Sequence, residues 1–229
     1  MDTADLLQEI RRRVIEWERK VWRPFPWRLS PTPYKAMVAQ FLLRRTTRTA
    51  VARRYPGFLA KYPDVFALAE APVEEIEHEL RELGMYRVRA RQLSEAARHI
   101  VAHHRGVIPD SWGALIRIPG LGPYGAGAVM SFGHGKRAPV VDANSGRVIS
   151  RLLGAGRMRL AELLRVAWVL VPSTEHALFN YGLVDLGAYV CTKRKEDCAK
   201  CPLKSLCVRA TGSPKLANSY RLLLAEAER

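Results

Sequence analysis

Four cysteines near the C-terminus are the side chains with the clearest chemical potential in this sequence of 229 residues. Disulfides join distant segments in oxidising compartments, whereas four thiolates within one short stretch suit a metal ion or an iron–sulfur cluster. The spacing C-x6-C-x2-C-x5-C therefore predicts a four-cysteine metal site and leaves zinc and iron–sulfur both open. The ligands would be Cys191, Cys198, Cys201 and Cys207.

A glycine-rich stretch upstream has the residues of a phosphate-binding turn. Residues 118–129 read I-P-G-L-G-P-Y-G-A-G-A-V, in which Gly120 and Gly122 permit a tight turn with positive φ angles. The turn leads into a helix whose first backbone N–H groups lack partners within the helix and can bind an anion. An ordinary glycine turn explains the same residues equally well. The small residues from Gly125 to Ala128 allow two helices to pack closely.

An aspartate follows the turn in the segment V-V-D-A-N-S-G-R. Two β-branched residues, Val140 and Val141, hold Asp142 in an extended, partly buried approach to the next helix. The ordinary interpretation is that Asp142 or Asn144 caps this helix.

The periodicity of apolar residues is helical through nearly the whole chain, and no segment alternates convincingly as a strand. The sequence therefore predicts an all-α fold, with Gly84 as a C-cap between two of the helices. Helices are expected at residues 4–20, from Tyr34 onward, and at 64–70, 72–83, 86–105, 145–153, 159–170 and 175–190, with two short helices within 111–131.

The composition indicates a folded, basic protein. Lys and Arg number 37 against 22 Asp and Glu, a formal net charge of +15, and 48% of residues are apolar. This excess predicts a polyanionic partner, above all nucleic acid, although charge that serves only solubility is the alternative. No run of about 18 apolar residues and no signal-peptide core occur, so we expect a soluble, monomeric, cytoplasmic protein associated with the nucleoid.

Taken together, the turn, the aspartate segment and the cysteines resemble the iron–sulfur branch of the helix-hairpin-helix DNA glycosylase superfamily. The resemblance runs from Pro26-Trp27-Arg28 to Cys207. It implies a two-lobed fold, with a six-helix lobe at 29–136 ending in the hairpin and a cluster lobe formed by 1–28 plus 137–229. It also implies a [4Fe-4S] cluster on the four cysteines and double-stranded DNA bound across the cleft between the lobes. In this family the hairpin amides grip a DNA phosphate and a monovalent cation sits on the hairpin carbonyls, here at Gly120, Gly122 and Gly125.

The resemblance assigns two residues to the chemistry. Asp142 matches the family's catalytic aspartate, which stabilises the sugar cation that forms when the base leaves. Tyr124 stands where members that cleave the strand carry a lysine, whose amine attacks the sugar and forms a Schiff base. A phenol cannot form a Schiff base, so a monofunctional glycosylase is expected. A simple packing role is the alternative for Tyr124.

The helix at residues 37–47 bears on which base is removed. Its L-L-R-R-T-T resembles thymine mismatch glycosylases, but Gln40 replaces the glutamate that both the thymine and adenine types carry. Adenine must be protonated to leave, and an amide cannot supply that proton. A pyrimidine can leave as an anion that hydrogen bonds to its carbonyls stabilise. Gln40 therefore disfavours adenine excision.

Several further residues are expected to touch DNA. Met85 resembles a wedge that fills space beside the orphaned partner base, and Arg44 or Arg45 would enter the gap left by the flipped base. A solvated basic face is the alternative for the arginines. The loop residues Lys193, Arg194 and Lys195 would contact phosphates. The sequence thus predicts a glycosylase for thymine or uracil in G·T and G·U mismatches, with an adenine or other damaged-base glycosylase and a weakened, DNA-binding homologue as alternatives.

Overall fold

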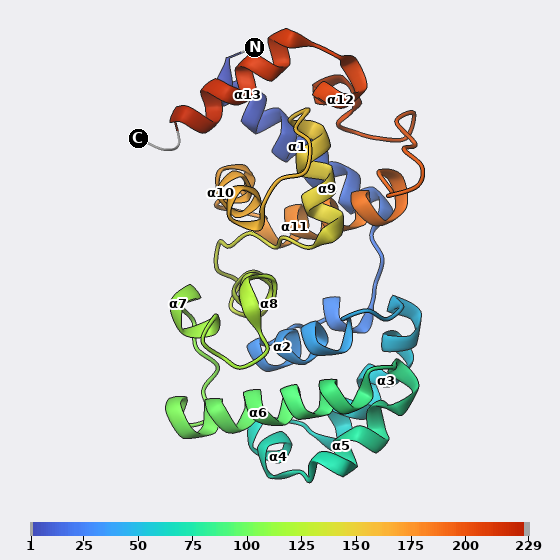
Figure 1. The fold of residues 1–229 in the computed structure, drawn as a ribbon, viewed down its shortest axis with the longest axis vertical. Coiled ribbons are helices and arrows are strands. Elements are labelled where there is room, and N and C mark those ends of the chain that lie inside the picture. The colour runs from blue at the N-terminus through green and yellow to red at the C-terminus, as the bar shows by residue number, and fades with distance from the viewer. Residues whose placement is uncertain (1, 227–229) are drawn as a thin grey trace. The chain divides into compact units, whose positions relative to one another are not determined.

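The computed structural model describes residues 2–226, and every named element in this part of the chain is a helix. It contains no named strand, only one isolated antiparallel bridge between Cys191 and Glu196. None of the described helices is long and apolar enough to cross a membrane. Contacts divide the chain into two compact units, shown in Figure 1: Met1–Trp22 with Arg137–Arg229, here called the cysteine unit, and Arg23–Lys136, here called the hairpin unit.

The hairpin unit is organised on its longest helix, α6. Helices α4 and α5 pack along α6, as Figure 1 shows. The contact face of α6 includes Ala90, Leu93, Ala97 and Ile100, whose spacing places them on one side of the helix. The elements are η1 (Pro26–Arg28), α2 (Pro33–Leu42), α3 (Arg48–Lys61), α4 (Val65–Glu70), α5 (Val73–Leu80), η2 (Arg81–Leu83), α6 (Tyr86–His104), α7 (Trp112–Leu115), α8 (Gly122–Ala128) and η3 (Val129–Gly133).

Helix α3 was not expected from the sequence. Pro56 lies inside it, and proline removes a backbone donor and disfavours a helix interior. The helix forms because Val51, Tyr55 and Phe58 bury one face, and because the Thr47 hydroxyl accepts a hydrogen bond from the Ala50 amide at 3.2 Å. Tertiary packing thus outweighs the local cost of the proline.

The cysteine unit is organised around α1, which packs against α11. Leu6, Ile10 and Val14 of α1 are fully buried in its core. Gly182 of α11 permits this packing, because a Cβ atom there would lie 2.6 Å from Val14 Cγ1. The elements are α1 (Thr3–Val21), α9 (Ala143–Leu152), α10 (Leu160–Leu170), α11 (His176–Asp185), η4 (Leu186–Val190), η5 (Lys204–Leu206), α12 (Val208–Thr211) and α13 (Pro214–Glu226).

The predicted helices are largely confirmed. Those expected at 4–20, 64–70, 86–105 and 159–170 are α1, α4, α6 and α10, each within one residue at either end. The segment expected as one helix at 175–190 instead divides into α11 and a wider π-helical turn, η4. Helix α13 was not predicted. The buried Tyr220 anchors it, since its hydroxyl donates to the Leu206 carbonyl at 2.8 Å.

Candidate active site and nucleic-acid interface

Asp142 caps the N-terminus of α9, as the ordinary interpretation of its sequence predicts. Its Oδ1 accepts hydrogen bonds from the amides of Asn144 at 2.9 Å and Ser145 at 2.7 Å. The Ser145 hydroxyl in turn accepts from the Asp142 amide at 2.9 Å, which completes a reciprocal capping box. The carboxylate is therefore fixed in place by the backbone of its own helix.

The second carboxylate oxygen of Asp142 is less engaged. Within residues 2–226, Oδ2 receives one hydrogen bond, from the Asn144 side-chain amide at 3.1 Å, and the residue is half-buried. A carboxylate oxygen can accept more than one hydrogen bond, so Oδ2 retains capacity for a further positive or donating group. The helix N-terminus also interacts favourably with a negative charge. This geometry presents an oriented carboxylate that can stabilise developing positive charge.

The hairpin has the backbone conformation that its glycines predict. Gly120 and Gly122 have φ angles of 74° and 65°. A Cβ atom on Gly120 would also lie 3.1 Å from Phe41 Cε1, so α2 approaches the turn closely. Gly125, which the resemblance implies contacts DNA, is buried, and a Cβ there would lie 2.6 Å from Leu121 Cδ1. Gly125 therefore allows the turn to fold against α8.

Arg44 reaches the hairpin from the end of α2. Its guanidinium donates to the carbonyls of Gly120 and Leu121, the latter at 3.1 Å, and to Gln92 Oε1 at 3.1 Å. It also lies 4.8 Å from the centre of the Phe41 ring. Burial lowers the pKa of Arg44. The arginine thus places its charge on the hairpin carbonyls, where the resemblance implies a monovalent cation.

Arg45 and Met85 are exposed residues with left-handed backbone conformations, at φ angles of 50° and 46°. Such angles in non-glycine residues cost about 1–3 kcal/mol and persist only where the surroundings impose them. Met85 leaves 48% of its surface exposed, as a wedge residue requires before DNA binds.

A buried arginine connects the segments that carry these two residues. Arg89 of α6 is 4% exposed, and its Nη1 donates to the carbonyl of Phe41 at 2.7 Å and to that of Leu42. Its Nη2 donates to the carbonyls of Arg44 at 2.9 Å and Gly84 at 3.2 Å. Arg89 therefore fixes the backbone immediately before each residue of the exposed pair.

Arg89 is therefore a buried structural cation, although arginine is mostly a surface residue. The helical register of the sequence carries a signal for this burial. Position 89 lies one turn before Leu93 on the buried face of α6. Arg87, by contrast, is exposed.

Gln40 and Tyr124 lie in helices α2 and α8 of the hairpin unit. Gln40 is 3% exposed, and its Nε2 donates to the Ala36 carbonyl at 3.3 Å. Its Oε1 is buried and has no hydrogen-bond partner in the described part of the chain. An unpaired buried acceptor is costly, so this atom suits a donor supplied by water or by a bound base. Tyr124 is half-buried. Burial lowers the pKa of the nearby Arg44, and a negative charge on the Tyr124 phenol would oppose that shift.

The four cysteines come together in the cysteine unit. All four are half-buried and line one small cavity. Burial raises the pKa of Cys201 to about 11 and also raises that of Cys207. Among the described residues, no three Cys, His, Asp or Glu side chains are arranged to hold a single metal ion. The four thiols thus line one shared cavity.

Three basic residues lie between the first two cysteines. Lys193, Arg194 and Lys195 are all exposed on one turn. The structure thus separates the predicted DNA-contacting residues into two sets, one on each unit. Arg45 and Met85 belong to the hairpin unit and this basic set to the cysteine unit.

Comparison with known proteins identifies the family of the chain. The model of the HhH-GPD superfamily of base excision DNA repair proteins matches residues 38–172. The thymine-DNA glycosylase of Aeropyrum pernix is 38% identical, over 88% of this chain and 94% of its own length. The thymine/uracil-DNA glycosylase of Methanothermobacter thermautotrophicus is also 38% identical, over 81% and 86% of the two chains.

A solved structure supports the same grouping. The structure of a thermostable thymine-DNA glycosylase superposes with a TM-score of 0.86 at 33% identity, covering 92% of this chain and 99% of the other. The chain belongs to the HhH-GPD superfamily of base excision DNA repair proteins.

Proposed function

We propose that this protein is a monofunctional DNA glycosylase of base excision repair that removes thymine or uracil from G·T and G·U mismatches in double-stranded DNA. The observation that carries the proposal is the Asp142 carboxylate, fixed through Oδ1 and available through Oδ2. The names of the relatives from Aeropyrum and Methanothermobacter support thymine and uracil as the excised bases.

Asp142 would act on the sugar of a nucleotide flipped out of the duplex. As the N-glycosidic bond breaks, its electron pair leaves with the base and the sugar gains oxocarbenium character. The Oδ2 atom stabilises this positive charge, while the backbone amides on Oδ1 prevent the carboxylate from rotating away. Water then adds its hydroxyl to the sugar carbon, and its proton is passed on to neutralise the departing base. The products are the free base and an abasic site.

Tyr124 supports the monofunctional assignment. A Schiff base needs an amine, and the phenol at this position cannot provide one. The abasic strand therefore stays intact until another agent cleaves it.

Gln40 supports a pyrimidine over adenine. Thymine and uracil present a ring N–H donor, which suits the unpaired Gln40 Oε1. Adenine presents an unprotonated ring nitrogen on the corresponding edge and needs an acid to leave, which an amide cannot supply. The adenine glycosylase alternative therefore has less support from the residues present.

The same proposal includes a [4Fe-4S] cluster on Cys191, Cys198, Cys201 and Cys207. The cavity that all four cysteines line supports it, because four thiolates brought together from one short stretch are the ligand set of such a cluster. When bound, the cluster cross-links this segment and supplies no step of base excision. The four cysteines would hold it, and three of them pack against the hydrophobic core of the cysteine unit.

Single-turnover excision tests the proposal. The substrates are duplexes with G·T, G·U, adenine opposite 8-oxoguanine, and thymine glycol, each analysed with and without alkali. We expect release of thymine and uracil, with strand breaks only after alkali. Release of adenine would contradict the argument from Gln40, and no release with intact DNA binding would favour a binding-only homologue.

A further inference from the structure

The loop between Cys191 and Cys198 carries a preformed basic turn, residues 192–195. The Thr192 amide and hydroxyl both donate to the Lys195 carbonyl, at 3.1 Å and 2.7 Å, and the Lys195 amide donates to the Thr192 hydroxyl at 3.0 Å. The bridge between Cys191 and Glu196 closes the turn at its base. The turn therefore has a defined shape, and Lys193, Arg194 and Lys195 project from it into solvent.

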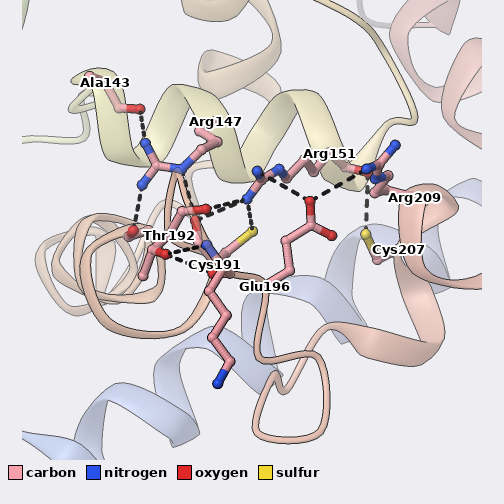
Figure 2. A network of polar contacts seen from close by, with 10 residues as sticks. Ala143, Arg147, Arg151, Cys191, Thr192, Glu196, Cys207 and Arg209 are labelled. Carbon is pink, nitrogen blue, oxygen red and sulfur yellow. Dashed lines mark hydrogen bonds and ion pairs between the residues drawn. The ribbon is translucent and has the colours of Figure 1, made fainter.

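Arg151, at the end of α9, donates hydrogen bonds to the backbone at the base of this turn. Its Nη1 donates to the carbonyls of Cys191 at 3.2 Å and Thr192 at 2.8 Å, and lies 3.2 Å from Cys191 Sγ. Figure 2 shows these contacts converging from one guanidinium. Because α9 is a core helix of the cysteine unit, Arg151 attaches the turn to a rigid element.

Glu196 orients the guanidinium of Arg151. Its Oε1 lies 3.2 Å from Arg151 Nη2 and 3.6 Å from Arg209 Nη2, so one carboxylate is shared by two arginines (Figure 2). The side chains of Arg151 and Glu196 are only 21% and 27% exposed, so solvent screens their pairing less than that of a surface ion pair. Arg147 adds a further positive group nearby, since its Nε donates to the Cys191 carbonyl at 2.8 Å. The arginines would repel one another without Glu196.

We propose that Glu196 and Arg151 are positioning residues that hold the basic turn in the shape that binds the phosphates of duplex DNA. This inference rests on the proposed function, because it takes duplex DNA as the ligand. The pair acts through the backbone of residues 191 and 192. It leaves the three cations of the turn free for phosphate groups.

Removal of Glu196 gives a test in which simple charge and positioning predict opposite signs. Glu196→Ala takes away a negative charge beside the basic turn and frees two arginines, so electrostatics alone predicts tighter DNA binding. Loss of the pairing between Glu196 and Arg151 predicts weaker DNA binding, because the turn no longer presents its three cations together. For each phosphate that the turn no longer neutralises, binding would weaken about eightfold at 0.1 M salt and the salt slope would fall by about 0.9.

The experiment measures affinity for an undamaged duplex by fluorescence anisotropy across a series of salt concentrations, using the full chain with its metal content assayed. Glu16→Ala is the matched control, since it removes an acid that pairs with Arg12 on α1 of the same unit. We expect weaker binding and a shallower slope for Glu196→Ala, and no weakening for Glu16→Ala. Wild-type affinity or tighter binding for Glu196→Ala would overturn the proposal.

Two further variants keep the test decisive. Thr192→Val changes no charge and removes the hydroxyl that closes the turn, so it should weaken binding in the same way even if Glu196→Ala loses its metal. Adding Glu196→Ala to a chain in which Lys193, Arg194 and Lys195 are alanine should cause no further loss. Additive losses, or wild-type binding by Thr192→Val, would refute the positioning role. A wild-type chain that neither binds duplex DNA nor releases a base would instead refute the proposed function itself.

Discussion

Substitution of Asp142 separates its two roles, helix capping and stabilisation of the sugar cation. Asp142→Ala removes the acceptor of two backbone amides, and loss of such an N-cap costs about 0.5–2 kcal/mol. For a chain of this size, each kcal/mol lowers Tm by about 2–4 °C. Asp142→Asn keeps an oxygen for the two amides and is an equally good capping residue. In the wild type, Oδ2 accepts a hydrogen bond from the Asn144 side-chain amide at 3.1 Å. In Asp142→Asn an NH2 group takes the place of Oδ2, and the unfavourable contact between the two NH2 groups costs only a fraction of the free energy that the cap contributes.

Both variants should lose excision almost completely, because neither has a negative charge to place against the sugar cation. Loss of one preorganised stabilising group costs about 10²- to 10³-fold in rate, and loss of a full charge at least as much. The assay pairs single-turnover release of thymine from G·T duplexes with thermal unfolding of the same samples. Asp142→Asn should unfold within about 2 °C of wild type and Asp142→Ala several degrees lower. Substantial excision by Asp142→Asn, or equal destabilisation by both variants, would refute the reasoning.

Three other predictions concern the hairpin unit. Tyr124→Lys places an amine where the phenol lies, so we expect a covalent adduct with abasic DNA on borohydride treatment, which wild type does not form; no trapped adduct would count against the assigned position. Gln40→Leu removes the free acceptor Oε1 at similar volume, so release of uracil should slow about tenfold while Tm stays the same or rises; an unchanged rate would remove Gln40 from the base pocket. Arg89→Met leaves the buried carbonyls of Phe41 and Leu42 unpaired, at about 1–3 kcal/mol each, so Tm should fall by at least about 4 °C; Arg87→Met, at an exposed position of the same helix, should leave Tm unchanged.

Features that depend on local chemistry can be predicted from the amino-acid sequence. Periodicity located most helices because burial of one face repeats every 3.6 residues. The glycines at 120 and 122 marked a turn with positive φ angles because other residues avoid that conformation. The capping role of Asp142 could also be predicted. A short side-chain acceptor with a polar residue three positions later forms reciprocal hydrogen bonds with the backbone amides at the start of the helix.

The groups that the arginine side chains contact could be identified only from the tertiary structure. Sequence shows only that an arginine is charged, and its long side chain reaches partners that lie far along the chain. Arg44 therefore contacts the hairpin carbonyls, and Arg89 holds two distant backbone segments from within the core. Arg151 grips the turn after Cys191 across 40 residues of sequence. Helix α3 likewise depends on tertiary structure. Its segment contains an internal proline, and it is helical because Tyr55 and Phe58 pack into the core.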